Sequence, residues 1–456
     1  MVTSAMNIEV DSRDHSAEPT VLVMGMGVTG ASCARYFAAR GRAAEFADTR
    51  EQPPGIDAIM DAMPDARVHT GMPPAELSPG IRQLVVSPGV DLQSPLMIAA
   101  RQRKIEIVSD IDLFVAECTG RIVAITGSNG KSTVTSMLGN MLSTVGWSVS
   151  TGGNLGTPAL DLLLPETEIY VLELSSFQLE RSKLIPASVS VLLNVSPDHL
   201  DRHLDMDAYA AAKARIYGAC DHAVLNRDAA DLAALVPAGT PVTSFGLDQP
   251  AAGELGIQVT SRGECITYGE TLLLSVDEFP LLGRHNLSNA LAALALGSVL
   301  GADLHGLAQA LKRYRGLPHR MEIVATANGV TWVDDSKATN VGAAVTSIQG
   351  IADPFILIAG GDAKGAGFEA LADALSGRQC AVILLGRDAV AISDVLEGIC
   401  DVKIVATMRD AVASAMAIAV PGHTVLLAPA CSSHDMFENF AERGDKFAGA
   451  VLEVTA

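Results

Sequence analysis

Short aliphatic runs recur along the chain, each followed by a Gly- or Ser-rich turn and then by a helical pattern. They occupy residues 21–25, 84–89, 121–127, 170–175, 189–196, 355–361, 381–386 and 424–430. Short apolar runs that alternate with helices are typical of strands buried on both faces of parallel sheets. The pattern therefore predicts an α/β protein in which the strand–helix unit is repeated several times.

One helix is predicted in detail, directly after the run 121–127. Its apolar positions are spaced as one face of an α-helix requires, and they are Val134, Met137, Leu138, Met141, Leu142 and Val145. Gly146 supplies the stop, because glycine readily adopts the left-handed conformation that ends a helix. This strand, turn and helix form the clearest unit in the chain.

Breaks in the pattern divide the 456 residues into a tail and three domains. The tail, residues 1–18, is polar and lacks the apolar stretch of a signal peptide, so we expect it to be disordered. The domains are expected over 19–110, 111–316 and 317–456. Residues 240–282 are rich in Thr and Val without a helical period, which favours a small β excursion inside the central domain. No functional role is assigned to that excursion.

Composition and charge narrow the class of protein. A net charge of −20 argues against nucleic-acid binding, which needs a basic face. Local cations and helix N-termini can still hold anionic substrates on an acidic protein. No apolar run approaches the roughly 18 residues that cross a bilayer, so no membrane insertion is expected. The seven cysteines are scattered without CxxC pairs, which favours a reducing, cytoplasmic location.

The strongest local signal is the glycine-rich turn between the run 121–127 and the predicted helix. Backbone N–H groups at such a turn point at a bound phosphate, and the helix dipole adds to the attraction. Lys131 would reach the outer phosphates, and the Ser132 hydroxyl would ligate Mg²⁺. Only two residues separate Gly127 from Gly130, so the segment is a shortened variant of the usual phosphate loop. An ordinary glycine-rich turn is the alternative.

A second glycine pattern follows the first strand. Gly25, Gly27 and Gly30 have the spacing of the dinucleotide fingerprint, and Asp48 follows close to twenty residues later. The physics requires only a phosphate at a helix N-terminus, so a UDP-sugar diphosphate fits as well as NAD. Because ATP chemistry is already assigned to the central domain, we favour a nucleotide-linked substrate and expect no NAD.

Three polar positions follow predicted strands of the central domain, at the sheet edge where α/β proteins bind ligands. Glu173 lies where carboxylates that hold nucleotide-bound Mg²⁺ are commonly found. His199 and Asn154 follow two other strands. Taken singly, Glu173 is equally explained as a capping group and His199 as an ordinary loop histidine.

Lys213 and a pair of asparagines carry weaker signals. By its spacing alone, Lys213 is interpreted as a solvated lysine on a helix. Asn286 and Asn289 share a helix face, and their amides suit an adenine edge. An asparagine at a helix start is more often an N-cap, which is the alternative.

Polar loops follow three predicted strands of the C-terminal domain. They cover residues 334–340, 360–364 and 430–440 and mix Lys, Ser, Thr and Asp. Such side chains suit a small dianionic amino acid, although ordinary polar loops remain the alternative for any one of them.

Apart from its tail, the whole chain resembles the Mur ligase family. The resemblance rests on residues 126–133, a phosphate loop that folylpolyglutamate synthases share, and on DSKATN (335–340) and ACSSHDMFENFAERG (430–444). The last two segments resemble the branch that adds D-glutamate, not those that add alanine, a diamino acid or the terminal dipeptide. The resemblance implies a Rossmann-like domain for a UDP-sugar, a central P-loop ATPase-type domain, and a Rossmann-like C-terminal domain for the amino acid.

The resemblance also implies roles for individual positions. The UDP-sugar site is matched by Val28, Thr29, Asp48, Thr49, Arg50, Ser87, Gly89, Asn154 and Gln178. The ATP site is matched by Gly127, Ser128, Asn129, Gly130, Lys131, Ser132, Thr133, Asn286, Asn289, Arg320 and Asp335. The D-glutamate site is matched by Lys337, Thr339, Lys364, Ser433 and Phe440.

Four positions match the family's catalytic residues: Lys131, Glu173, His199 and Lys213. Of these, Glu173 and His199 match metal ligands together with Ser132, and Lys213 matches a lysine that is carbamylated by CO₂ and then helps to hold Mg²⁺. Two positions depart from the family pattern. His434 stands where relatives often carry an apolar residue, and His203 stands where an aromatic residue is expected.

The implied reaction is ATP-dependent ligation of D-glutamate to UDP-N-acetylmuramoyl-L-alanine in peptidoglycan synthesis. It passes through an acyl-phosphate and a tetrahedral intermediate, uses two Mg²⁺ ions, and releases ADP and phosphate. A monomer is expected. The alternatives are another Mur-type or folylpolyglutamate-synthase-like ligase, an NAD-dependent oxidoreductase that uses Gly25–Gly30, and a binding protein without catalytic activity.

Overall fold

The computed structural model describes residues 20–71, 77–91, 93–197, 202–203, 205–261 and 263–455. The predicted tail and His199 lie outside these ranges. The chain separates into two compact units, which are described one at a time. The first contains the described residues up to Ala124 with Ser148–Ser188 and Gly218–Cys220, and the second contains Ile125–Trp147, Val189–Tyr217 and the chain from Asp221 onward.

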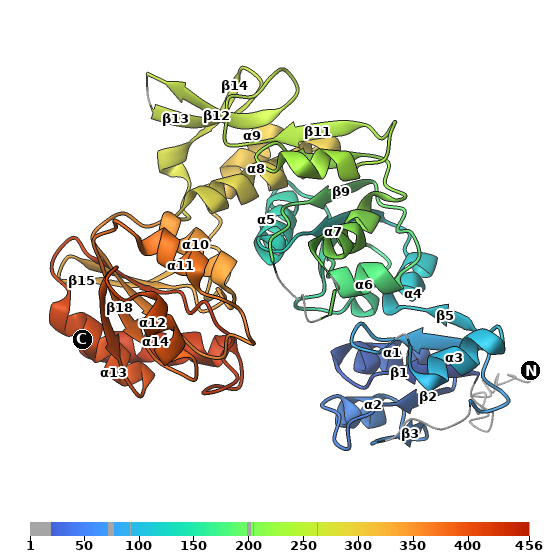
Figure 1. The fold of residues 1–456 in the computed structure, drawn as a ribbon. Coiled ribbons are helices and arrows are strands. Elements are labelled where there is room, and N and C mark those ends of the chain that lie inside the picture. Colours follow the sequence, from blue (N-terminus) through green and yellow to red (C-terminus); the bar gives the residue numbers. More distant parts are fainter. Residues whose placement is uncertain are drawn as a thin grey trace, which may run out of the picture. The chain divides into compact units, whose positions relative to one another are not determined.

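The first unit opens with a five-stranded parallel sheet, drawn in blue in Figure 1. Its order is β3-β2-β1-β4-β5, with β1 Val21–Met24, β2 Ala44–Ala47, β3 Arg67–His69, β4 Gln83–Val86 and β5 Glu106–Val108. The helices are α1 Val28–Ala39, α2 Ile56–Ala62, α3 Pro95–Gln102 and α4 Asp110–Glu117. Because β1 has β2 and β4 as its neighbours, the loops after these three strands leave the same edge of the sheet.

The central sheet has nine strands in the order β14-β13-β12-β11-β10-β9-β6-β8-β7. Its first strands along the chain are β6 Arg121–Thr126, β7 Val149–Gly153, β8 Ile169–Glu173, β9 Val189–Leu192 and β10 Ala223–Asn226. The helices are α5 Lys131–Thr144, α6 Ser176–Arg181, α7 Met206–Ala214, α8 Arg284–Val299 and α9 Leu304–Leu311. The predicted apolar stripe of α5 is buried from Val134 to Leu142, and Gly146 has the expected left-handed backbone.

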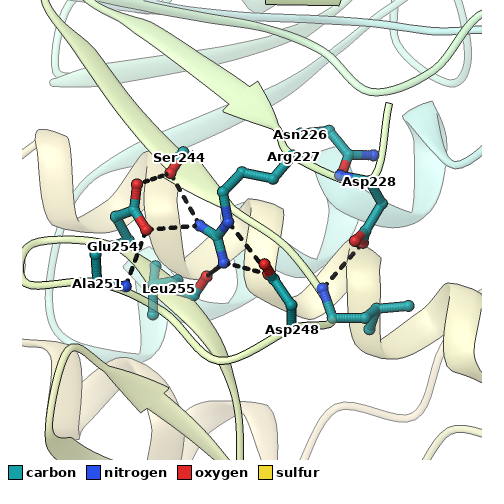
Figure 2. Close-up of polar contacts among 9 residues, drawn as sticks. Asn226, Arg227, Asp228, Ser244, Asp248, Ala251, Glu254 and Leu255 are labelled. Atoms are coloured by element: carbon teal, nitrogen blue, oxygen red, sulfur yellow. Dashed lines mark hydrogen bonds and ion pairs between the residues drawn. The ribbon is translucent and has the colours of Figure 1, made fainter. Parts of the chain in front are cut away.

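The β excursion predicted over 240–282 is present. It consists of β11 Val242–Phe245, β12 Leu255–Thr260, β13 Gly263–Tyr268 and β14 Thr271–Ser275. Figure 2 shows how Arg227, just after β10, is enclosed by this segment. Its guanidinium donates to Asp248 at 2.6 Å, to the Ser244 hydroxyl at 2.9 Å and to a backbone carbonyl of β12 at 3.1 Å. Glu254 completes the group by accepting from Ser244 at 2.6 Å.

The C-terminal sheet has six strands in the order β15-β16-β20-β17-β18-β19. They are β15 Glu322–Ala327, β16 Val330–Asp334, β17 Phe355–Ala359, β18 Cys380–Leu384, β19 Asp401–Ile404 and β20 Thr424–Leu427. Only the β15–β16 pair is antiparallel. Asn328 and Gly329 both have positive φ between these strands, as a two-residue hairpin turn requires.

Helices cover both faces of this sheet. The core on one face contains side chains of α10 Val341–Gln349, α11 Glu369–Leu375 and α12 Ala389–Val395. The other face packs against α13 Met408–Ile418 and α14 Phe440–Thr455. The prediction of repeated strand–helix units in an α/β protein is therefore confirmed. No helix among the described residues is long and apolar enough to span a membrane.

Candidate functional site

The glycine-rich turn leads from β6 into α5 as predicted. Gly130 is the N-cap of α5 with φ 84°, and a Cβ there would meet the Asn289 side-chain oxygen at 2.5 Å. Glycine is therefore needed both for the left-handed backbone and for the close approach. Lys131, the first residue of α5, folds back over the turn and donates to the carbonyls of Gly127 and Ser128, both at 2.8 Å.

The turn is held by the chain that follows β9. Asn129 and Asn194 exchange two hydrogen bonds, backbone N–H to side-chain oxygen at 2.9 Å and side-chain amide to backbone carbonyl at 3.1 Å. The Ser128 hydroxyl accepts from the backbone N–H of Ser196 at 3.0 Å. These bonds fix the loop conformation through segments about 65 residues apart in sequence, which no local pattern could reveal.

Lys213 contacts this loop from another element. It lies on α7, only 1% of its surface is exposed, and its ammonium donates to the Gly127 carbonyl at 2.9 Å. The ammonium also lies 4.5 Å from the centre of the Tyr209 ring. The interpretation of Lys213 as a solvated helix lysine is therefore wrong, because the side chain is buried and its ammonium contacts the loop. His203, the residue that departs from the expected aromatic, packs against the same Tyr209 ring with 5.0 Å between the ring centres.

A pocket of about 80 Å³ in the second unit joins most of the predicted ATP-binding positions. Asn286 and Asn289 lie on the buried face of α8, which begins at Arg284 with Gly283 as its N-cap, so the N-cap interpretation of these asparagines is wrong. A nucleotide needs more room than this pocket encloses and would extend out of it. Predicted residues that line it are Asn129, Gly130, Thr133, Asn286, Asn289, Arg320 and Asp335, with Lys337 of the predicted amino-acid site.

Asp335 is the buried acid of this pocket. Burial raises its pKa to about 6, although the Ser347 hydroxyl and the charge of Arg320 favour the carboxylate. The Met321 backbone N–H also donates to it, at 3.3 Å. A hydroxyl or cation supplied by a ligand would stabilise the ionised form of this carboxyl, because either would replace the hydration that burial removes.

A second cavity, of about 280 Å³, lies in the first unit. Four of the predicted UDP-sugar residues line it: Val28, Thr29, Asn154 and Gln178. The remaining predicted residues, Asp48, Thr49, Arg50, Ser87 and Gly89, lie in the loops after β2 and β4. Hydrogen bonds from Arg50 hold the pKa of Asp48 down at about 2, and its carboxylate also accepts from the Met26 N–H at 2.7 Å.

The same cavity is lined by an acidic residue that was not predicted from the sequence. Asp110, the first residue of α4, lines it with 3% of its surface exposed, and its Oδ1 has no hydrogen-bond partner. Burial raises its pKa to about 6. In the sequence Asp110 is an ordinary acidic residue at a helix start, so nothing local distinguishes it from Asp112.

Glu173 ends β8 and is 2% exposed. Its Oε1 accepts from the Asn154 amide at 2.8 Å, while its buried Oε2 has no partner. The capping interpretation of Glu173 finds no support, because Ser175 caps α6 and forms a capping box with Gln178. A buried carboxylate oxygen without a partner fits the oxygen ligands that Mg²⁺ prefers.

Four of the predicted D-glutamate residues lie on loops at the carboxyl ends of β16, β17 and β20, and Phe440 is the first residue of α14. The Lys337 ammonium lies 4.0 Å from the centre of the Phe440 ring. Asp362 and Ser432 pair through two backbone hydrogen bonds, which joins the loop of Lys364 to that of Ser433. Thr339 donates its N–H to the Lys337 carbonyl at 2.7 Å. His434 is exposed.

Arg443 on α14 ties two of these loops together and was also missed. It is 2% exposed and donates to the Ser336 hydroxyl and carbonyl and to the Cys431 carbonyl, at 2.8–3.0 Å. Burial lowers its pKa to about 10. A signal existed in the sequence, because Arg443 occupies the apolar stripe of α14 between Phe440 and Phe447. A charged residue in such a stripe indicates a buried polar contact.

The partly buried His319 and the buried Asp334 form a further pair, Nδ1 to carboxylate, at 2.7 Å. Burial raises the pKa of Asp334 despite this hydrogen bond. The backbone carbonyl of His319 accepts from the Lys337 N–H at 3.1 Å. The pair therefore supports the backbone of the Lys337 loop.

Comparisons with known proteins cover nearly the whole chain. Three family profiles match: "Mur ligase MurD-like, N-terminal domain" over 19–109, "Mur ligase middle domain" over 125–297, and "Mur ligase, glutamate ligase domain" over 319–431. A UDP-N-acetylmuramoylalanine–D-glutamate ligase from Nitrosococcus oceani is 47% identical, covering 95% of this chain and 97% of its own. The protein of that name from Pseudomonas aeruginosa is 45% identical, covering 95% and 98%.

Solved structures agree on the fold. UDP-N-acetylmuramate–alanine ligase MurC from Thermotoga maritima has a TM-score of 0.60 at 17% identity, over 96% of this chain and all of its own. MurF ligase from Thermotoga maritima, solved in complex with ADP, has a TM-score of 0.58 at 20% identity, over 91% and 96%. These two similarities concern the architecture alone.

Proposed function

Since the chain belongs to the Mur ligase family, we propose that it joins D-glutamate to UDP-N-acetylmuramoyl-L-alanine at the expense of ATP, in peptidoglycan precursor synthesis. The observation that carries this proposal is the 41–47% identity, along almost the entire chain, to relatives that bear the name of this activity. We propose a cytoplasmic location, where ATP and nucleotide-linked sugars are available, and a monomeric state, which light scattering after gel filtration would test.

The ATP chemistry is assigned to the loop 127–133 and its surroundings. A carboxylate is a poor electrophile, so ATP first converts the L-alanyl carboxylate of the substrate to an acyl-phosphate, with ADP as the leaving group. The loop amides and the Lys131 ammonium would stabilise the charge that spreads over the transferring phosphoryl group. Asn286, Asn289, Arg320 and Asp335 line the adjoining pocket and would hold the nucleoside and phosphates.

Mg²⁺ is expected with ATP, and two ions are proposed. Bound with ATP, Mg²⁺ would supply positive charge that offsets the charge of the phosphates. The proposed protein ligands are Ser132, Glu173, His199 and Lys213. The partnerless Glu173 Oε2 supports this set, since a buried carboxylate oxygen without a hydrogen bond is costly unless a ligand satisfies it.

Lys213 can ligate a metal only after modification, because an ammonium has no acceptor. CO₂ would add to the neutral amine and give an anionic carbamate, with loss of a proton. We predict a protein-bound carbamate signal in the ¹³C spectrum of enzyme equilibrated with ¹³C-bicarbonate. The signal should be missing from Lys213→Met and present in Lys403→Met, a substitution of an exposed lysine on β19. Equal spectra for the two variants would contradict carbamylation.

The second half of the reaction is assigned to the C-terminal loops. Lys337, Thr339, Lys364, Ser433 and Phe440 would bind D-glutamate, the two lysines supplying charge for its carboxylates. Its neutral amine attacks the acyl-phosphate carbon, a tetrahedral intermediate forms, and phosphate departs. Arg443 holds the loop backbone from behind and is a positioning residue in this proposal.

The decisive measurement is phosphate release from ATP in the presence of UDP-N-acetylmuramoyl-L-alanine, with D-glutamate, L-glutamate, L-alanine and a diamino acid tested in parallel. Release that depends on D-glutamate establishes the reaction and the substrate together. Release with another amino acid would keep the ligase and overturn the D-glutamate assignment. Release with a folate substrate instead of the UDP-sugar would favour the folylpolyglutamate-type alternative, and no release under any condition would refute ligase activity.

A further inference from the structure

Two cysteines stand side by side at an edge of the C-terminal sheet. Cys380 is the first residue of β18, and Cys400 directly precedes β19, the edge strand. The strands are parallel, and Ala381 pairs with Asp401. Cys380 and Cys400 each precede one of these residues, so the two cysteines are also neighbours. Adjacent strands lie about 4.8 Å apart, which is inside the Cα separation that a disulfide bridges.

The two side chains also point the same way. Cys380 and Cys400 both pack, partly buried, against the core that α10, α11 and α12 cover. Val382 and Val402, two residues further along each strand, are on the same face, as the alternation of a strand requires. Both cysteine residues are partly exposed to solvent.

The thiols interact directly. A hydrogen bond from Cys400 and the charge of Arg378 hold the pKa of the Cys380 thiol below its usual range, against burial and the nearby Asp353 carboxylate. The same hydrogen bond and burial raise the pKa of Cys400. Cys380 is therefore the better nucleophile of the two, because the thiolate is the reactive form.

We propose that Cys380 and Cys400 form a redox-active dithiol, which a small-molecule disulfide converts to an intrachain cross-link between β18 and β19. The Cys380 thiolate attacks one sulfur of the small disulfide, forms a mixed disulfide and releases one small thiol. Cys400 then attacks the Cys380 sulfur, forms the protein disulfide and releases the second small thiol. Two protein thiols are oxidised and one small disulfide is reduced to two thiols.

The cross-link lies at the end of the sheet opposite to the proposed amino-acid site. Cys380 and Cys400 stand at the amino ends of their strands, whereas the predicted D-glutamate residues follow carboxyl ends. The closed loop contains Arg387 and Asp388, which bond to Asp362 at 2.7 Å and to the Ala363 N–H at 2.7 Å. We therefore expect the cross-link to raise the resistance of the C-terminal domain to unfolding and to leave its loops in place.

The test uses the full-length protein incubated with oxidised glutathione, alkylated and mapped by mass spectrometry. The expected product is one cross-linked peptide pair that contains Cys380 and Cys400, with the loss of two hydrogens. Cys400→Ser should instead accumulate a stable glutathione adduct on Cys380. Cys118, a partly buried thiol whose hydrogen bond goes to the Gly120 carbonyl, is the internal control and should at most gain an adduct.

A second readout is thermal unfolding in oxidising and reducing buffer. The midpoint should rise by several degrees on oxidation of the wild type and should not rise in Cys380→Ser or Cys400→Ser. Glutathione adducts on Cys380 and Cys400 without a cross-link, or no reaction of either thiol under conditions that modify Cys118, would overturn the proposal. A cross-link between another pair of cysteines would do so as well.

Discussion

At the scale of single residues, two ammonium groups donate hydrogen bonds to the same carbonyl of the phosphate-type loop. Lys131 and Lys213 donate to the Gly127 oxygen at 2.8 and 2.9 Å. The motif alone identified Lys131, because it lies inside a local pattern. Lys213 reaches the same atom from 86 residues away in sequence, and only the resemblance pointed to it. Burial of a lysine is costly without such contacts, which is why its position indicates function.

We predict that Lys131→Met lowers the rate of D-glutamate-dependent phosphate release by at least about 10²-fold, because it removes a positive charge from the site where the phosphoryl group transfers. The substitution keeps the length of the side chain, so the loop should still fold. Thermal unfolding would establish that the variant is intact. Lys403→Met, at an exposed position, should keep wild-type activity. A loss of less than a few-fold in Lys131→Met would contradict the assigned role.

Asp110 gives a prediction on pH. Burial raises its pKa to about 6, above the value of about 3.9 in an unfolded chain. The folded protein therefore binds this proton more tightly than the unfolded chain, so stability falls as pH rises from about 4 to about 6 and stays lower above that. Asp110→Asn should remove this loss, which amounts to about 3 kcal/mol at 1.36 kcal/mol per pKa unit.

The measurement is urea unfolding of the wild type and Asp110→Asn between pH 4 and pH 8. The two proteins should differ little near pH 4, and the Asn variant should be the more stable at pH 8. Asp112→Asn is an unsuitable control because Asp112 belongs to the capping box of α4. Asp57→Asn, in the first turn of α2 at an exposed position, is a better one and should show no such difference. A constant offset at all pH values would show that Asp110 is not titrating.

At the scale of elements, the pattern predicted the helix α5, because burial against a sheet imposes a repeat that the sequence displays directly. The apolar runs predicted the buried strands β1, β4, β6, β8, β9, β17, β18 and β20. The antiparallel pairing of β15 with β16 was not predicted, although Asn328 and Gly329 carry the signal of a tight hairpin. Arg443 was passed over for a related reason. A hydrophobic pattern predicts which face of a helix is buried. It does not predict which carbonyl groups accept hydrogen bonds from a buried guanidinium on that face.

One side chain links the β excursion to the strand that precedes it. Arg227 joins β10 to the segment 244–255, and its side chain is 19% exposed. We predict that Arg227→Met destabilises the protein by about 1–2 kcal/mol, because its hydrogen bonds to Asp248 and Ser244 are lost and Ser244 is buried. Activity per folded molecule should not change, since none of these residues lines either pocket.

Urea unfolding with a parallel phosphate-release assay would check this prediction. The matched control is Arg284→Met, which breaks the pair with Glu264. Those side chains are 47% and 40% exposed, so their ion pair should contribute at most about 0.5 kcal/mol. Equal destabilisation by the two substitutions would mean that the Arg227 group is worth no more than a surface ion pair.

At the scale of the whole molecule, the proposed reaction requires ligands from three domains to meet. Most of the UDP-sugar, ATP and D-glutamate positions are assigned to different domains, and an acyl-phosphate must be kept from water until the amine attacks. We predict that the radius of gyration measured by small-angle X-ray scattering decreases when a non-hydrolysable ATP analogue and UDP-N-acetylmuramoyl-L-alanine are both present. Each ligand alone serves as the control. An unchanged radius with both ligands would contradict domain closure.

The sequence by itself determined the class of fold, the phosphate-type loop and, through long motifs in all three domains, the family. These are properties of contiguous segments, where burial and phosphate binding demand particular residues at fixed local spacing. Only the tertiary structure decided that Lys213 is buried at the Gly127 carbonyl, that Asp110 lines a cavity with its Oδ1 unpartnered, and that Arg443 hydrogen-bonds to two loops. The partners of these side chains lie elsewhere in the chain or are absent. Such contacts follow no repeat, so no periodic pattern in the sequence predicts them.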